Sequence, residues 1–312
     1  MYYPYLRAKQ FELLAIREFV SLLGNAGRKI FPVIEPVKKT FSSLHKAMET
    51  LVEKANPFAL IINPQVGEIT GKTEWIVDNI PEEIKVNNFF YPAYIVHAVA
   101  SYKAIERHIT EKGHRNVILI LSNVGDIDNQ DFISLYSNDN IQIIIIEQDN
   151  RTLKRKLLNA GKSVVLLKDN FNTQKRNSDY RNQSDEFFTE EHSFFHDEGY
   201  SGFSDYTTIG KDFSEGGRLP WAVAIHLTYK KNSEQVWIRH FVSDTNDDDS
   251  NIQGKFGEAA EKAVNFLEEK DMHYQACEEL RGYYFSETYP GLGMIKKISI
   301  KQHLELMNDL LT

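Results

Sequence analysis

Short apolar, β-rich runs recur along the chain with helical segments between them, and this alternation restricts the fold more than any other feature. Seven such runs come before residue 170, at residues 2–6, 30–34, 58–62, 89–95, 116–121, 142–146 and 163–167. Strands that alternate with helices are typical of a parallel sheet with crossover helices. Some runs are apolar on consecutive residues, as in VILIL, so we expect strands that are covered on both faces.

Helical spacing of the apolar residues separates these runs. It predicts helices at residues 10–24, 42–55, 101–112, 129–136 and 150–159, with another within 67–79. Two further helices are predicted near the C-terminus, at residues 256–270 and 303–311. We expect the first of these two to be the eighth helix of a barrel.

Residues 170–198 interrupt the alternation, because they are polar and aromatic with only a weak helical pattern. We predict an insertion or a mobile lid here, after the seventh strand. The eighth strand is then expected at residues 200–205, with 221–229 as the alternative. We favour the first, because a tight polar link joins 221–229 to 235–242 and predicts an added β-hairpin over 221–242.

Eight βα units in 312 residues predict a (β/α)8 barrel of the TIM type. We expect one barrel-like domain over residues 1–312, with the insertion at 170–198 and the hairpin at 221–242. A chain of this length also allows two smaller domains. A doubly wound open sheet is the other alternative, but the first strand is not followed by a G-x-G-x-x-G motif.

Composition narrows the classes of protein. The formal net charge of −8 and the small size of the basic clusters disfavour direct binding to nucleic acid. Cys277 is the only cysteine, which excludes an intrachain disulfide, and its acidic neighbours Glu278 and Glu279 predict a raised thiol pKa and a poor nucleophile. Neither a signal peptide nor a membrane-spanning run is apparent, so we expect a cytoplasmic protein without a membrane partner.

If the barrel prediction holds, the active face lies at the carboxyl ends of the strands. Polar residues follow nearly every strand: Arg7, Lys9, Glu35, Asn63, Gln65, Tyr94 or His97, Ser122, Asn123, Glu147, Asp149, Lys168, Asp169 and Asp205. Strands also end where polar loops begin, so these residues are equally expected without a site.

Glu35 stands out because it ends an apolar run and precedes a proline. Desolvation there would raise its pKa toward a range that is useful for acid–base catalysis. The alternative is an ion pair with Lys9 or Arg7 at the barrel mouth. With Glu147 and Asp205, Glu35 could also form a carboxylate set for a divalent metal or for hydrolysis. No spacing motif identifies a metal or a cofactor, so both stay undetermined.

Several other patterns carry weaker predictions. The glycine-rich stretch 199–226 could form a ligand site at a strand end, or an ordinary surface loop. Lys168 could form a Schiff base, although a salt bridge is the simpler role. His192 and His196 have the spacing of a zinc pair on a helix but lack an H-E-x-x-H motif, and the acidic run 244–249 lacks the glycine and distal glutamate of a calcium loop.

The N-terminal sequence YPYLRAKQFELLA (residues 3–15) and the segment IFPVIEP (residues 30–36) resemble the "beta protein" family, which is named after a phage T4 protein. The patch at residues 204–206 is similar to a late G-D-Y-like segment of that family. The resemblance implies a barrel-like α/β domain, and the family-like polar positions are Lys9, Glu12, Glu35 and Asp205. It implies no established catalytic role for them. It also implies a place in phage-defence or mobile-element gene clusters, some beside a predicted nuclease.

Two functions follow from these observations. The first is a component of a bacterial anti-phage defence or mobile-element system, a barrel-shaped protein-interaction or ligand-sensing subunit with a protein partner encoded nearby, for which a nuclease is one candidate. The second is a barrel hydrolase or phosphodiesterase that uses Glu35 and Asp205 with Lys9, with or without a metal. We favour the first, and we expect ligand-binding positions at Glu12, Asn63, Ser122, Glu147 and Lys168.

Overall fold

Eight parallel strands form a nearly closed barrel in the computed structural model, which describes residues 1–23, 29–216 and 220–311. The strands neighbour one another in the order β1-β2-β3-β4-β5-β6-β7-β9. A parallel bridge between Tyr2 and Phe203 joins the first and last strands, and the Tyr3 N–H donates to the Phe203 carbonyl at 2.8 Å. The barrel strands are β1 (Tyr5–Arg7), β2 (Val33–Glu35), β3 (Phe58–Ile61), β4 (Phe90–Val96), β5 (Val117–Leu121), β6 (Ile141–Ile146), β7 (Ser163–Lys168) and β9 (Gly202–Asp205).

The (β/α)8 prediction is therefore confirmed, and each barrel strand overlaps a predicted run. The eighth strand lies at the favoured position within 200–205. Helices follow the strands, and all but α4 lie at predicted positions: α1 (Gln10–Leu22), α2 (Ser42–Glu53), α3 (Thr73–Asp78), α4 (Glu82–Lys85), α5 (Ser101–Lys112), α6 (Gln130–Ser137) and α7 (Arg151–Asn159). The predicted end of the first helix at Gly24 lies outside the described residues.

The barrel strands are buried on both faces, which explains their consecutive apolar residues. Alternate side chains, among them Tyr5, Val33 and Ile120, fill the interior of the barrel. Their neighbours, such as Leu6 and Leu119, pack outward beneath the helices. This alternation decides which strand-end side chains can reach the barrel mouth.

The insertion after β7 contains η1 (Asn177–Gln183), β8 (Asp185–Thr189) and α8 (Glu191–Phe194). The predicted hairpin is confirmed as β10 (Ala224–Lys230) paired antiparallel with β11 (Val236–Val242). Strand β8 pairs antiparallel with β11, so insertion and hairpin together make a three-stranded sheet in the order β10-β11-β8. Strand β8, which the sequence pattern does not predict, joins the insertion to the hairpin.

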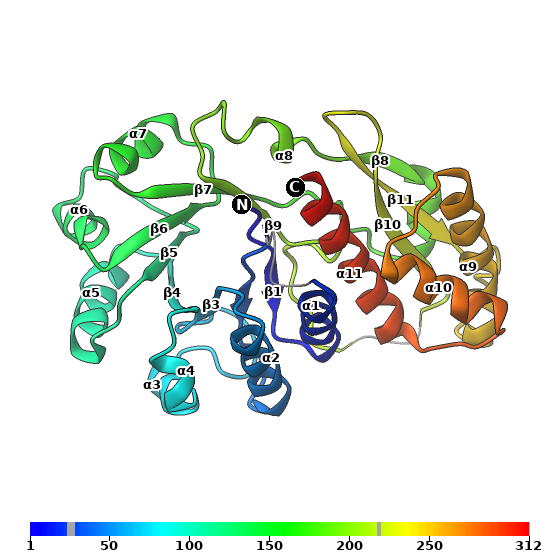
Figure 1. Ribbon diagram of the computed structural model, residues 1–312, viewed down its shortest axis with the longest axis horizontal. Helices are drawn as coiled ribbons and strands as arrows, with labels where there is room; N and C mark the ends of the chain where they lie inside the picture. The colour runs from blue at the N-terminus through cyan, green and yellow to red at the C-terminus, as the bar shows by residue number, and fades with distance from the viewer. Residues whose placement is uncertain (24–28, 217–219, 312) are drawn as a thin grey trace.

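Three helices complete the described chain: α9 (Ile252–Glu269), α10 (Gln275–Phe285) and α11 (Leu292–Leu310). Helices α9 and α10 build a second hydrophobic core on the three-stranded sheet, where Phe266 packs against Tyr229 and Phe241. Helix α11 packs against α1 and β10, between the barrel and the three-stranded sheet (Figure 1). None of the helices in the described ranges has both the length and the apolar character needed to span a membrane.

The prediction that residues 256–270 form the eighth barrel helix is wrong. Those residues lie in α9, which covers the added sheet, whereas α11 occupies the place beside α1. An amphipathic pattern shows that a helix buries one face, but it does not show which sheet receives that face. The short helix predicted at 303–311 is the second half of the longer α11.

Candidate functional site

Glu35 lies inside the barrel mouth and has hydrogen-bond partners at both carboxylate oxygens. Its Oε2 accepts from the Tyr5 hydroxyl at 2.8 Å and from Nε of Arg7 at 3.0 Å, and its Oε1 accepts from the Gln65 N–H at 2.9 Å. The residue is only 1% exposed. The predicted ion pair with Arg7 is therefore present, and the carboxylate is enclosed by donors.

A second network closes the mouth from the side of β9. The Tyr206 hydroxyl donates to Glu147 at 3.0 Å, and Nζ of Lys211 lies 2.7 Å from the other oxygen of Glu147. Arg7 donates from Nη2 to the Lys211 carbonyl at 2.7 Å. These bonds hold residues 206–216, which we call the mouth loop, across the carboxyl ends of the strands.

Asp205 lies on the outer face of the barrel wall, away from Glu35. Its Oδ1 accepts from the Tyr2 hydroxyl at 2.5 Å, and its Oδ2 lies 3.5 Å from Nε2 of His303 on α11. The next residue, Tyr206, is the one that points into the barrel. The structure thus does not bring Asp205 and Glu35 together around one space.

Besides Glu35 and Asp205, three predicted site residues, Asn63, Ser122 and Lys168, make contacts that join one part of the fold to another. Asn63 donates to the carbonyl of Ile95 and accepts from its N–H, both at 2.8 Å, and so joins β3 to β4. Ser122 donates to a backbone carbonyl of β4 at 3.2 Å. Lys168 forms an ion pair with Glu191 of the insertion, whereas the salt bridge expected from the sequence involved its neighbour Asp169.

The alternatives at the end of β4 separate in space. Tyr94 faces outward, and its hydroxyl lies 2.7 Å from Nδ1 of both His108 and His114. His97 lines a cavity of about 510 Å³ beside that cluster. The remaining strand-end residues contact nearby loops: Asp149 accepts from the Tyr200 hydroxyl at 2.6 Å, Asp169 accepts from the Lys211 N–H at 3.2 Å, and the Asn123 N–H donates to the Val96 carbonyl at 3.3 Å.

The largest space near the mouth lies between the mouth loop, β10 and the start of α11. This mouth cavity has a volume of about 710 Å³, within the usual range for small-molecule sites. The residues that line it include Lys9, Lys38, Thr208, Tyr180, His226 and Lys296. Asp212 and Glu215 line it too, so the cavity combines three lysines and two carboxylates with hydroxyl, aromatic and imidazole groups.

Lysine side chains give the mouth cavity its positive charge. Lys9 donates to the Ser214 carbonyl at 2.8 Å and lies 4.6 Å from the ring centre of Phe213. Burial lowers the pKa of Lys9, the charge of Glu12 opposes this shift, and the charges of Lys296, Arg7 and Lys38 add to it. Lys296 is exposed and has no hydrogen bond or ion pair with any residue in the described ranges. A bound anion would relieve this repulsion.

The start of the mouth loop is strained and has unpaired hydroxyls. Thr207 has a φ of 54°, which is unfavourable for a β-branched residue. Within the described part of the chain, the buried Oγ1 atoms of Thr207 and Thr208 have no hydrogen-bond partner. Thr208 is 2% exposed and lines the mouth cavity. Strain and unpaired polar atoms at a strand end are features that cluster at functional sites.

Glu12, the remaining family-like position, lies on α1 and makes a pH-dependent contribution to stability. Burial raises its pKa to about 7 from an ordinary value of 4.5, against the opposing charge of Lys9. Between pH 4.5 and pH 7 the folded protein holds the Glu12 proton more tightly than the unfolded chain does. The free energy of unfolding therefore increases as the pH falls from 7 to 4.5, and it decreases as the pH rises over the same range.

We therefore expect Glu12→Gln to raise the free energy of unfolding by up to about 3 kcal/mol at pH 8 and to have little effect below pH 4.5. Urea unfolding at the two pH values measures this difference. The exposed Glu49→Gln is the matched control and should have no effect at either pH. An equal effect of Glu12→Gln at both pH values would show that its carboxyl does not titrate as described.

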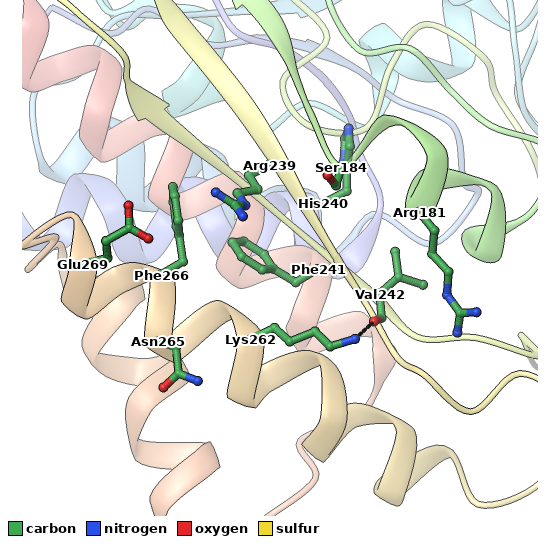
Figure 2. A pocket seen from close by; sticks show the side chains of 10 residues that line it. All are labelled: Arg181, Ser184, Arg239, His240, Phe241, Val242, Lys262, Asn265, Phe266 and Glu269. Carbon is green, nitrogen blue, oxygen red and sulfur yellow. Dashed lines mark hydrogen bonds between the residues drawn. The ribbon is translucent and has the colours of Figure 1, made fainter.

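A third cavity, of about 410 Å³, lies between β11 and α9 (Figure 2). Two of its cations already have backbone partners. The Lys262 amine donates to the Val242 carbonyl at 2.8 Å, and Arg181 donates to the carbonyls of Ser243 and Asp244. These contacts link η1 and α9 to the end of β11, and the third cation of the cavity, Arg239, lies 4.9 Å from the ring centre of Phe266.

The weaker sequence patterns do not assemble into a metal site. In the ranges that the structure covers, no three His, Cys, Asp or Glu side chains are grouped as metal ligands. His196 packs against the Phe195 ring, and the acidic run 244–249 forms ion pairs with lysines of α9. Cys277 is buried, and burial raises its thiol pKa to about 12. The predicted rise is confirmed, but burial is its main cause and the adjacent glutamates contribute little.

The mouth cavity includes residues that sequence reasoning did not select, namely Lys38, Thr208 and Lys296. They come from separate elements, so no local motif unites them. His226 was noted only as the end of the glycine-rich stretch. The predicted hairpin offered a signal for it, because antiparallel pairing places His226 opposite His240.

Comparison of the chain with protein-family models, with curated proteins and with solved structures gave no match.

Proposed function

We propose that this chain is a ligand-sensing subunit that binds an anionic small molecule in the mouth cavity. The observation that carries the proposal is the convergence of Lys9, Lys38 and Lys296 on one space at the carboxyl ends of the strands. Ligands of (β/α)8 barrels bind at this face. Lys38 is partly balanced by Glu68 at 2.9 Å and Glu215 at 3.7 Å, which leaves Lys9 and Lys296 as the main anion-binding groups.

Binding is better supported than catalysis by the predicted carboxylates. Glu35 already accepts three hydrogen bonds, and Asp205 lies on the other side of the barrel wall. Two carboxylates that flank one scissile bond must face a common space. The geometry therefore gives no support to a hydrolase that uses Glu35 and Asp205 with Lys9.

We expect Lys9→Met and Lys296→Met each to weaken anion binding by roughly 10- to 100-fold, because each removes a charged hydrogen-bond donor. Isothermal titration calorimetry with inorganic phosphate, sulfate and a panel of phosphorylated metabolites measures the effect. The matched control is Lys46→Met, at an exposed lysine of α2 that does not line the cavity. Binding that is unchanged in both cavity variants, or that is lost equally in the control, would refute the anion site.

The wider role of the subunit rests on the resemblance of residues 3–15 and 30–36 to the "beta protein" family. We place it in the cytoplasm as a component of an anti-phage defence or mobile-element system, where ligand binding is passed to a protein partner such as a nuclease. Purification of the tagged chain from its native host should recover that partner in stoichiometric amounts. A chain that purifies alone, with and without saturating ligand, would contradict this role.

A further inference from the structure

Two histidines form a direct pair at the wall of the mouth cavity. His226 on β10 lies opposite His240 on β11, and their Nδ1 atoms are 2.6 Å apart. Nε2 of His240 lies 2.9 Å from Oε1 of Glu186 on β8. The three side chains thus form a chain from the added sheet to the mouth cavity, which His226 lines.

The position of each proton in this chain follows from its partners. A carboxylate only accepts hydrogen bonds, so Nε2 of His240 carries the hydrogen that faces Glu186. Burial lowers the pKa of His240 and lowers that of His226 well below its ordinary value, so both rings are neutral at pH 7. Nδ1 of His240 is then bare and accepts from Nδ1–H of His226.

It follows that Nε2 of His226 carries no hydrogen. It has no partner among the residues that the structure describes, and the half-buried ring lines the mouth cavity. His226 therefore presents a hydrogen-bond acceptor to any molecule in that cavity. A ligand group that meets it must be a donor, such as an amine or a hydroxyl.

Aromatic rings surround this acceptor. The ring centre of His226 lies 5.1 Å from that of Phe171 and 4.7 Å from that of Tyr180, and all three residues line the cavity. Such walls favour a flat, polarisable ring. The other groups of the cavity, Lys9 and Lys296, favour an anion. One space thus offers two lysines, an aromatic wall and a neutral imidazole acceptor, and the carboxylates of Asp212 and Glu215 also line it.

We propose that the ligand of the mouth cavity is a nucleotide with an amino base of the adenine or cytosine type. Its phosphate binds Lys9 and Lys296, its base lies against Phe171 and Tyr180, and its exocyclic amine donates to Nε2 of His226. His240 and Glu186 are positioning residues that set the tautomer of His226. This inference rests on the proposed function, because it names the chemical class of the anion that the sensing subunit binds.

Three probe molecules separate the parts of this proposal in calorimetric titrations of the intact chain. Ribose 5-phosphate carries only the anionic part, AMP adds the amino base, and IMP replaces the amine with a carbonyl oxygen. We expect AMP to bind at least tenfold more tightly than either of the others, because ribose 5-phosphate has no base and IMP has a carbonyl oxygen, which cannot donate to His226, in place of the exocyclic amine.

Glu186→Gln tests the positioning role. Its amide group can donate to Nε2 of His240, which moves the hydrogens along the chain and turns Nε2 of His226 into a donor. We expect the preference for AMP over IMP to shrink by tenfold or to reverse, while the affinity for ribose 5-phosphate stays unchanged. The control Glu234→Gln lies in the exposed turn of the same hairpin and should keep the wild-type preference.

The outcomes distinguish this inference from the proposed function. Equal binding of ribose 5-phosphate and AMP would refute the nucleotide and leave the anion site intact. Equal binding of AMP and IMP to the wild type, or a Glu186→Gln variant with the wild-type preference, would refute the acceptor role of His226. If none of the three binds while another anion from the phosphorylated panel does, the nucleotide inference alone is wrong.

Discussion

Replacing Asp205 with alanine is expected to lower the free energy of unfolding by about 3–5 kcal/mol. The carboxylate is fully buried and accepts from the Tyr2 hydroxyl at 2.5 Å and from the Thr207 N–H at 2.8 Å. Alanine leaves the Thr207 N–H without a partner in a site that excludes water, and the Tyr2 hydroxyl keeps only its contact with Nε2 of His303, 3.0 Å away. Urea unfolding monitored by circular dichroism measures the loss.

Two further variants define the cause. Asp205→Asn keeps an oxygen for both donors and loses only the charge that faces His303, so we expect a smaller loss than for alanine. The exposed Asp197→Ala should be neutral. If Asp205→Ala is as stable as the wild type but loses ligand binding, Asp205 acts in a site and its structural assignment is wrong.

Glu35→Gln is expected to destabilise the protein by about 3–5 kcal/mol, because it leaves the buried Arg7 guanidinium without its counter-ion. In the variant, the NH2 group of the glutamine also faces hydrogen-bond donors that bind the carboxylate in the wild type, namely the Tyr5 hydroxyl and Arg7 or the Gln65 N–H. Thermal and urea unfolding measure this loss, and the folded fraction should retain its affinity for anions because Glu35 does not line the mouth cavity.

Glu147→Gln is a matched control in the same mouth, since Glu147 is more exposed than Glu35 and pairs with an exposed lysine. We expect it to lose about 1 kcal/mol or less. A Glu35→Gln variant that folds with wild-type stability but lacks an activity of the wild type would restore the catalytic interpretation of Glu35.

The barrel could be predicted from the sequence because its strands are encoded locally. The run Val117–Leu121 is apolar at every position, and a strand buried on both faces requires that pattern. Strand β8 was missed because DEFFT begins with two acidic residues and has no apolar run, and it becomes a strand by pairing with β11. Helix α9 was recognised as amphipathic, but its partner surface depends on how distant segments pack.

The candidate site was harder to predict, because the side-chain face of a strand changes with every residue. Asp205 and Tyr206 are neighbours, yet one lies under α11 and the other points into the barrel. Glu35 could be placed at the mouth because it follows the second apolar run. Two roles were predicted for it, a desolvated acid–base group or an ion pair with Lys9 or Arg7, and the pair with Arg7 is the one present. The mouth cavity also includes Lys296, which lies more than 250 residues after Lys38 in the sequence, so no local pattern connects the two.

The place of α11 affects how the protein is made. This helix covers α1 and β10, and its His303 contacts the Tyr2 hydroxyl, which lies 301 positions earlier in the chain. Among the described elements α11 is the last to leave the ribosome, so the outer surface of the first strand and first helix stays uncovered until synthesis of this helix is finished. Contacts across such a sequence distance form slowly, and the apolar surface of α1 is exposed to other chains in that interval. The barrel is therefore expected to be most prone to aggregation in the interval before α11 packs against α1.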